Sequence, residues 1–185
     1  VTWTGFGQDG DAPDQSNIYA KQFVGNDAFL ASSLSNYKFE SLADRLPGLE
    51  LSTTTDNPAN HVVSPNTGYD GVVQVLMPGG GLGSGSLLYT GRHILTAAHV
   101  VDDGTGNPWP SIDVVFELSD STRFSMTSSV MYIHPGWTGD LFDGNDIAII
   151  VLPETAPIEA DRYDIYRGSS ELNREFTIVG YGTAG

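Results

Sequence analysis

Two side chains in this sequence, His99 and Asp146, have the residue types and surroundings of an acid–base pair. His99 ends the run LTAAH, residues 95–99. Histidine exchanges a proton near neutral pH, and the small alanines before it let the backbone turn tightly while one ring nitrogen stays open to a reactant. Asp146 stands directly before the apolar run IAIIVL, residues 147–152, which predicts a buried strand. A carboxylate in that place can orient an imidazole and stabilise its protonated form.

Taken singly, each residue also has an ordinary structural explanation. A lone histidine is more often packed or capped than catalytic, and an aspartate before a core strand is often a solvated turn residue. The elements around the two residues must therefore be considered together.

Those elements predict an all-β domain. The apolar stretches are short, and 22 glycines and 10 prolines punctuate them, as is typical of many strands joined by turns. We expect a barrel or a sandwich. Its strands are predicted at residues 72–77, 85–89, 92–95, 112–118, 123–133, 147–152 and 176–181.

The first 60 residues have a different pattern. An apolar stripe over residues 27–46 is compatible with a helix, and residues 52–58 have the Ser, Thr, Asp, Asn and Pro content of a linker. We therefore predict an N-terminal extension or propeptide, residues 1–60, and a β domain, residues 61–185. The alternative is that residues 1–60 are irregular surface of a single domain.

Longer motifs give the pair a family context. The run GSGSLLYTGRHILTAAHVV, residues 83–101, resembles the histidine motif of chymotrypsin/trypsin-like serine proteases, and DGNDIAIIVL, residues 143–152, resembles their aspartate segment. Between them, IHPGW at residues 133–137 is similar to the stretch that leads to this aspartate, which makes His134 structural. TIVGYG, residues 177–182, resembles the strand that opens the second barrel, with Tyr181 in place of a tryptophan. The histidine precedes the aspartate by 47 residues (146 − 99), which is the chain order of chymotrypsin-like barrels.

The resemblance implies a chymotrypsin-like double β-barrel, here the first barrel plus the opening strand of the second. It implies a serine endopeptidase acting through an acyl-enzyme, with His99 as general base and then acid and Asp146 as its orienting partner. This sequence contains neither the family's GDSGGP-like nucleophile loop nor a Gly-x-Ser-x-Gly pattern. We expect the serine in a C-terminal part outside this chain, so that the chain alone is inactive.

Three explanations of the missing serine stay open: an N-terminal cleavage product that remains paired with a C-terminal chain, a truncated form, or a noncatalytic binding module on the same scaffold. A housekeeping protease with an appended peptide-binding domain shares the histidine motif and is a further alternative.

The disulfide that commonly brackets the histidine is absent, because Gly83 and Val100 stand where cysteines are usual. The segment VVSP, residues 62–65, lies where zymogens are cut but does not match the usual Ile-Val-Gly-Gly.

Composition restricts the partners. The net charge of −15 would repel a nucleic acid backbone, and no apolar run is long enough to cross a membrane. The chain has no cysteine, so it has no thiol chemistry and no cysteine-ligated zinc. We expect a secreted protein that acts on proteins or peptides and requires no cofactor. Asp oxygens gather at residues 102–107 and 9–11, which we interpret as solvated turns. Structural calcium is the alternative there, although neither segment completes a twelve-residue calcium loop.

Overall fold

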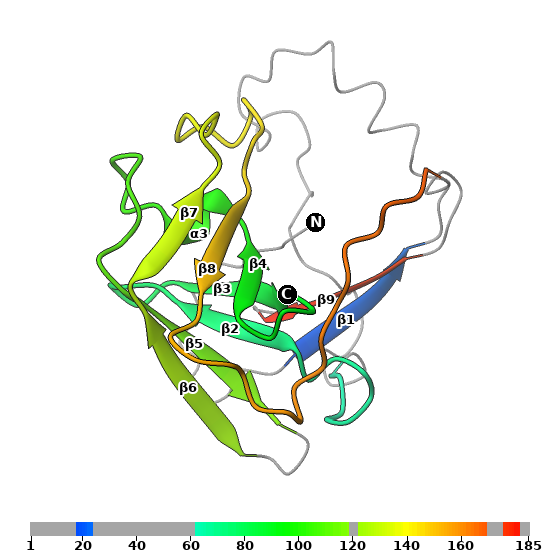
Figure 1. Cartoon of the computed structure of the whole chain (residues 1–185). Helices are drawn as coiled ribbons and strands as arrows, with labels where there is room; N and C mark the ends of the chain where they lie inside the picture. The colour runs from blue at the N-terminus through cyan, green and yellow to red at the C-terminus, as the bar shows by residue number, and fades with distance from the viewer. Residues whose placement is uncertain (1–17, 24–61, 119–121, 170–175, 182–185) are drawn as a thin grey trace.

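The computed structural model describes residues 18–23, 62–118, 122–169 and 176–181, and in these residues the protein is all-β with a single short helix (Figure 1). Seven antiparallel strands form a curled sheet in the order β6-β5-β2-β3-β4-β8-β7. They are β2 (Val72–Leu76), β3 (Leu82–Leu87), β4 (His93–Thr96), β5 (Ile112–Glu117), β6 (Arg123–Ser128), β7 (Val130–Ile133) and β8 (Ala148–Val151). The helix is α3 (Ala98–Val101). The predicted all-β class is confirmed.

The sheet curls because β6 and β7 are consecutive in the chain but stand at its two opposite ends. The prediction of one strand over residues 123–133 was therefore wrong. At the corner, the Ser128 hydroxyl accepts a hydrogen bond from the Val130 N–H (3.1 Å) and donates one to the carbonyl oxygen of Val151 in β8 (2.6 Å). One serine thus turns the chain from one end of the sheet to the other and fastens the corner to β8.

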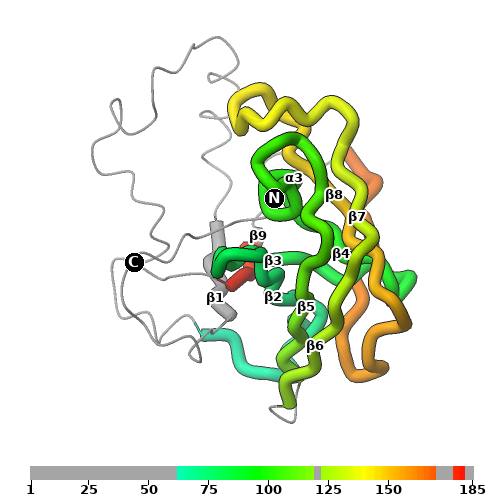
Figure 2. The backbone as a smooth tube through the Cα atoms, turned by 90° about the vertical axis from the view of Figure 1, so that its left-hand side faces the viewer, coloured from blue at the N-terminus to red at the C-terminus, as the bar shows by residue number. Residues whose placement is uncertain are grey.

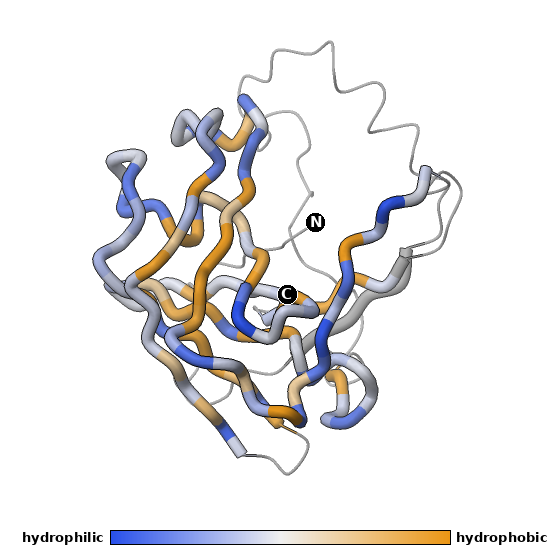
Figure 3. Tube along the Cα trace, viewed as in Figure 1, coloured by the Kyte–Doolittle hydropathy of each residue, from blue (hydrophilic) through white to orange (hydrophobic). Residues whose placement is uncertain are grey.

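Alternating side chains form the core inside this curled sheet. In β4 and β8, buried residues alternate with partly buried ones, and Ile94 and Ile150 are fully buried. Such alternation is expected of strands with one face towards a core. Figure 3 shows hydrophobic residues concentrated along the strands and hydrophilic residues in the loops between them.

Two glycines in β3 allow its neighbours to approach closely. A Cβ atom on Gly85 would lie 2.4 Å from a methyl of Ile94 in β4, and one on Gly83 would lie 2.7 Å from a methyl of Val100 in α3. The strand begins at Leu82, earlier than the predicted start at residue 85, although glycine is a poor strand former. The family resemblance places a disulfide between positions 83 and 100. Here the Val100 side chain occupies the space next to Gly83 that this disulfide would take.

A second, two-stranded sheet lies beside the first. Its strands are β1 (Ile18–Phe23) and β9 (Phe176–Tyr181), antiparallel, with Ile18 opposite Tyr181 and Phe23 opposite Phe176. β9 contacts β2 and β3, and Figure 2 shows it beside these two strands. β9 was predicted with these bounds and β1 was not predicted. The helix expected over residues 27–46 and the linker at 52–58 lie outside the described residues.

Candidate active site

The register of two neighbouring strands brings His99 and Asp146 to the same end of the sheet. β4 and β8 are antiparallel, and Thr96 at the end of β4 lies opposite Ala148 at the start of β8. The chain reaches His99 three residues after Thr96, and it leaves Asp146 two residues before Ala148. Residues beyond an antiparallel pair at one end must emerge close together.

The two side chains meet through both oxygens of the carboxylate. Asp146 Oδ2 lies 2.7 Å from His99 Nδ1, and Asp146 Oδ1 accepts a hydrogen bond from the backbone N–H of His99 at 2.9 Å. The His99 and Asp146 side chains keep 19% and 24% of their surface exposed. An ionised carboxylate can only accept, so in this contact the imidazole donates through Nδ1. The predicted contact between the two residues is confirmed. Asp146 holds His99 at two points, the ring nitrogen Nδ1 and the backbone N–H.

Small residues hold His99 at this place. Ala97 is extended and Ala98 begins α3; both are buried, with 2% and 0% of their surface exposed. Their methyl groups fit against the core where larger side chains would push the helix away from the sheet. His99 consequently stands on the partly exposed side of a helix whose other residues are buried.

A tight turn before β8 places Asp146 beside His99. Gly144 and Asn145 both have positive φ, 78° and 59°, a conformation that glycine adopts freely and that asparagine tolerates better than most residues. The Ile147 N–H donates to the carbonyl oxygen of Asn145 at 2.8 Å. Asp146 is therefore the middle residue of a closed turn directly before β8, which fits its predicted position before a buried strand.

A buried serine links the strands behind the pair. The Ser84 hydroxyl accepts a hydrogen bond from the Tyr181 N–H (2.7 Å) and donates one to the Tyr181 carbonyl oxygen (3.1 Å). The Ser84 carbonyl oxygen accepts from the hydroxyl of Thr96, at the end of β4 (2.9 Å). With both hydrogen-bonding roles used on β9, Ser84 is a structural link. The sequence motif around Ser84 could not predict this role, because both hydrogen-bond partners of its hydroxyl are on β9, far away in the chain.

Polar groups are also buried where β9 crosses the sheet. Burial raises the pKa of the Tyr181 hydroxyl, and the nearby Glu117 carboxylate raises it further. Burial raises the pKa of Glu117 as well, and the Arg123 guanidinium opposes this only in part. Gln74, 1% exposed, accepts a hydrogen bond from Arg123 at 2.9 Å. The Tyr181 hydroxyl on β9 is therefore buried beside a carboxylate of the seven-stranded sheet.

The loop proposed for calcium uses its carboxylates internally. Asp102 Oδ1 accepts hydrogen bonds from the backbone N–H groups of Gly104 (2.8 Å) and Gly106 (2.9 Å), and Asp103 Oδ1 accepts from that of Thr105 (2.8 Å). These are side-chain-stabilised turns, as expected of Asp followed by Gly. In the described part of the chain, no three His, Asp or Glu side chains gather as metal ligands. Residues 9–11 lie outside it.

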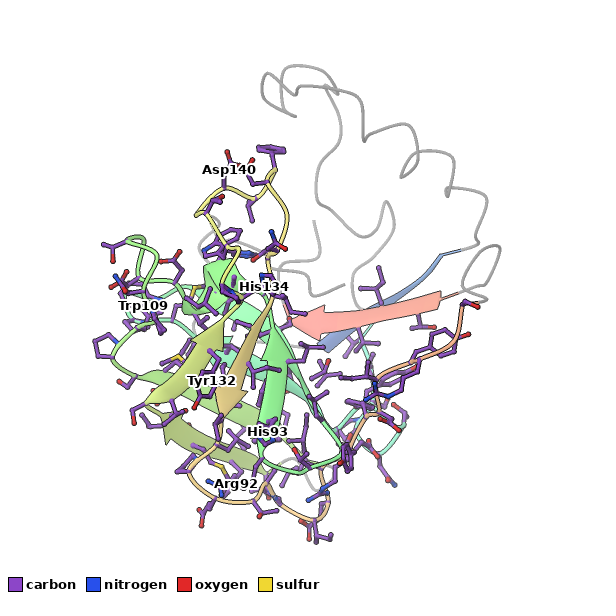
Figure 4. The ribbon with its side chains drawn as sticks, turned by 45° about the horizontal axis from the view of Figure 1, so that its top comes forward. Arg92, His93, Trp109, Tyr132, His134 and Asp140 are labelled. Carbon is purple, nitrogen blue, oxygen red and sulfur yellow. The ribbon has the colours of Figure 1, made fainter. Side chains whose placement is uncertain are left out.

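The loop between β7 and β8 completes the surroundings of the pair. Figure 4 shows His134 at the base of this loop and Asp140 near its tip, with Arg92 and His93 at the opposite end of the sheet. His134 Nδ1 accepts a hydrogen bond from the Gly136 N–H at 3.1 Å, so its ring shapes the turn, as its structural interpretation implies.

None of the helices described is long and apolar enough to cross a membrane.

Comparison with known proteins agrees with this geometry. A search of the curated proteins found no match. The family model named Trypsin matches residues 61–185, about two thirds of the chain, and this range contains both His99 and Asp146. With a histidine and an aspartate in contact at one end of a curled antiparallel sheet, and with this match over most of its length, the chain belongs to the trypsin family of serine proteases.

Proposed function

We propose that this chain carries the general base and its orienting partner of a serine endopeptidase, with His99 and Asp146 in these roles. The observation that supports this most directly is the double contact of Asp146 with the ring and the backbone of His99, at 2.7 and 2.9 Å. A histidine held in this way keeps one tautomer and one orientation through a reaction, which is what proton transfer to and from a nucleophile requires.

The proposed reaction is acyl transfer to a serine and then to water. His99 Nε2 takes the proton of the serine hydroxyl as its oxygen bonds to the peptide carbonyl carbon, and Asp146 stabilises the resulting imidazolium. His99 then gives this proton to the leaving amine as the peptide bond breaks, and an acyl-enzyme remains. Water repeats the sequence, with its proton passing through His99 back to the serine oxygen.

The nucleophile and the oxyanion hole are proposed to come from a C-terminal part of the same protease. Two observations support this: these 185 residues contain no GDSGGP-like segment, and β9 corresponds to the strand that opens the second barrel in the family resemblance. We further propose that the protein is secreted, is made as a zymogen and acts on proteins or peptides.

Hydrolysis of a protein substrate by the complete protein tests the two roles. His99→Ala should lower kcat by about 10⁶-fold and Asp146→Asn by about 10⁴-fold, because each removes one member of a cooperating set. His93→Ala is the matched control, since His93 begins β4 at the opposite end of the sheet, and among the described residues its ring hydrogen-bonds to Thr90 (2.7 Å). Turnover retained by His99→Ala, with the fold intact, would refute the assignment. If the wild type lacks turnover, the protein is a binding module on a protease scaffold.

A further inference from the structure

Asp102 is fixed to the helix that carries His99. Its backbone N–H donates to the carbonyl oxygen of Ala98 at 2.9 Å, which ends α3. The residue is 9% exposed, and its carboxylate has two functions. Oδ1 holds the turn that follows the helix, and Oδ2 accepts a hydrogen bond from the indole N–H of Trp137 at 2.7 Å.

Trp137 belongs to the loop that leads to Asp146. Its backbone N–H closes a turn onto the carbonyl oxygen of His134 at 2.9 Å, and its side chain packs against the main core. The carbonyl oxygen of the preceding residue, Gly136, accepts a hydrogen bond from the side chain of Asn145 at 3.1 Å. Asn145 directly precedes Asp146 in the chain. At the base of the loop, the His134 N–H donates to the carbonyl of Ile147 at 3.0 Å.

From these contacts we infer that Asp102 and Trp137 are a positioning pair, which sets the separation between the His99 helix and the loop that delivers Asp146. The bond joins residues 35 apart in the chain, whereas the other two bonds of the carboxylate stay within its own turn. A short hydrogen bond to a buried carboxylate is of the strong, charge-assisted kind. It can therefore hold two segments whose relative movement would lengthen the contact between His99 and Asp146.

Trp137→Phe is the direct test, because it keeps most of the ring and removes only the indole donor. Trp109→Phe is the matched control. Trp109 packs against the same core, and its buried indole N–H has no hydrogen-bond partner among the described residues (Figure 4). Asp102→Asn is a second variant: its amide oxygen can still accept from Gly104 and Gly106, while its NH2 group would face the Trp137 N–H.

Two measurements on the complete protein separate positioning from general stability. The first is the far-downfield proton NMR signal of the hydrogen between His99 Nδ1 and Asp146, identified by its loss in His99→Gln. We expect Trp137→Phe and Asp102→Asn to shift or broaden this signal, and Trp109→Phe to leave it unchanged. The second is kinetic. The same two variants should lower kcat by roughly 10-fold to 100-fold with little change in KM, because a small misplacement of a catalytic group is costly.

The kinetic arm rests on the proposed protease activity, and the NMR arm does not. If the wild type has no turnover, the proposed function fails while the signal still tests the pair. The inference is overturned if Trp137→Phe and Trp109→Phe give the same signal and the same kcat. It is also overturned if Trp137→Phe and Asp102→Asn both fail to fold, because the pair would then maintain the whole domain and not the site.

Discussion

At the scale of single residues, buried polar side chains show where the fold is sensitive to pH. Glu117 lies between the Arg123 guanidinium, with Arg123 Nε 3.5 Å from Oε1, and the hydroxyl of the fully buried Tyr181. Its carboxylate loses more by desolvation than it gains from the arginine, so the folded pKa of Glu117 is raised. A raised carboxyl pKa means that the folded state favours the protonated form.

The sign of the resulting pH dependence follows. Stabilisation by protonated Glu117 is fully present below its unfolded-state pKa, and it is lost as the pH rises through the higher folded pKa. We therefore predict that Glu117→Gln stabilises the protein relative to wild type more at pH 7 than at pH 4, because glutamine keeps the polar contacts without the charge. Thermal unfolding of both proteins at the two pH values measures this. An equal difference in Tm at both would contradict it.

The acid–base pair itself could be predicted from single residues and their order. His99 and Asp146 each stand beside a recognisable run, and the contact between them follows once the runs are strands that pair. The roles of Ser84 and Trp137 could not be predicted, because their partners lie 97 and 35 residues away and no local pattern marks such a bond. Asp102 illustrates the limit: a turn at residues 102–107 could be predicted, whereas the bond from Asp102 to Trp137 could not.

At the scale of elements, strands with alternating apolar residues were predictable and corners were not. The predicted strands at residues 72–77, 112–118 and 176–181 match β2, β5 and β9 to within one residue at each end. The break between β6 and β7 was missed because residues 123–133 contain no Gly or Pro to mark a corner. A serine that turns a chain by bonding its own neighbour has the same sequence pattern as a serine on a strand surface.

The contact between β3 and α3 gives a prediction about the missing disulfide. A Cβ on Gly83 would lie 3.4 Å from the Cβ of Val100, close to the separation in disulfides, roughly 3.5–4.5 Å. We predict that the double variant Gly83→Cys, Val100→Cys forms this bond on oxidation, since the valine methyls that crowd Gly83 are removed. The bond closes a loop of 17 residues (100 − 83), which the chain-entropy model values at about 3 kcal/mol.

Comparing the oxidised and reduced forms of this double variant isolates the bond from the loss of valine packing. The oxidised form should melt several degrees higher. The single variants are suitable controls because the natural sequence has no cysteine. Two titratable thiols after oxidation, or an unchanged Tm, would show that the two elements are not in contact.

At the scale of the whole molecule, the predicted extension takes part in the β structure. β1 comes from the first 60 residues, outside the range of the family match, and pairs along the full length of β9, inside that range. β9 in turn packs on the sheet through Tyr181 and Val72, the two buried residues of a small second core. β1 thus pairs with the strand that is predicted to open the second barrel.

Paired cysteines test this arrangement. Ala20 lies opposite Val179 in the register, so we predict that the variant Ala20→Cys, Val179→Cys crosslinks under mild oxidation. Ala20→Cys with Ile178→Cys is the control, because neighbouring residues of a strand point to opposite faces. Electrophoretic mobility of the oxidised and reduced forms reports the crosslink. Equal crosslinking of both variants would show that this register is not maintained.

The central claim is that His99 and Asp146 serve a serine nucleophile, and labelling of the complete protein with a fluorophosphonate tests it most directly. We predict that one serine beyond residue 185 is modified in the wild type and in His93→Ala, and that His99→Ala reacts far more slowly because its serine is not activated. Absence of labelling in a folded wild type, or equal labelling of wild type and His99→Ala, would contradict the account.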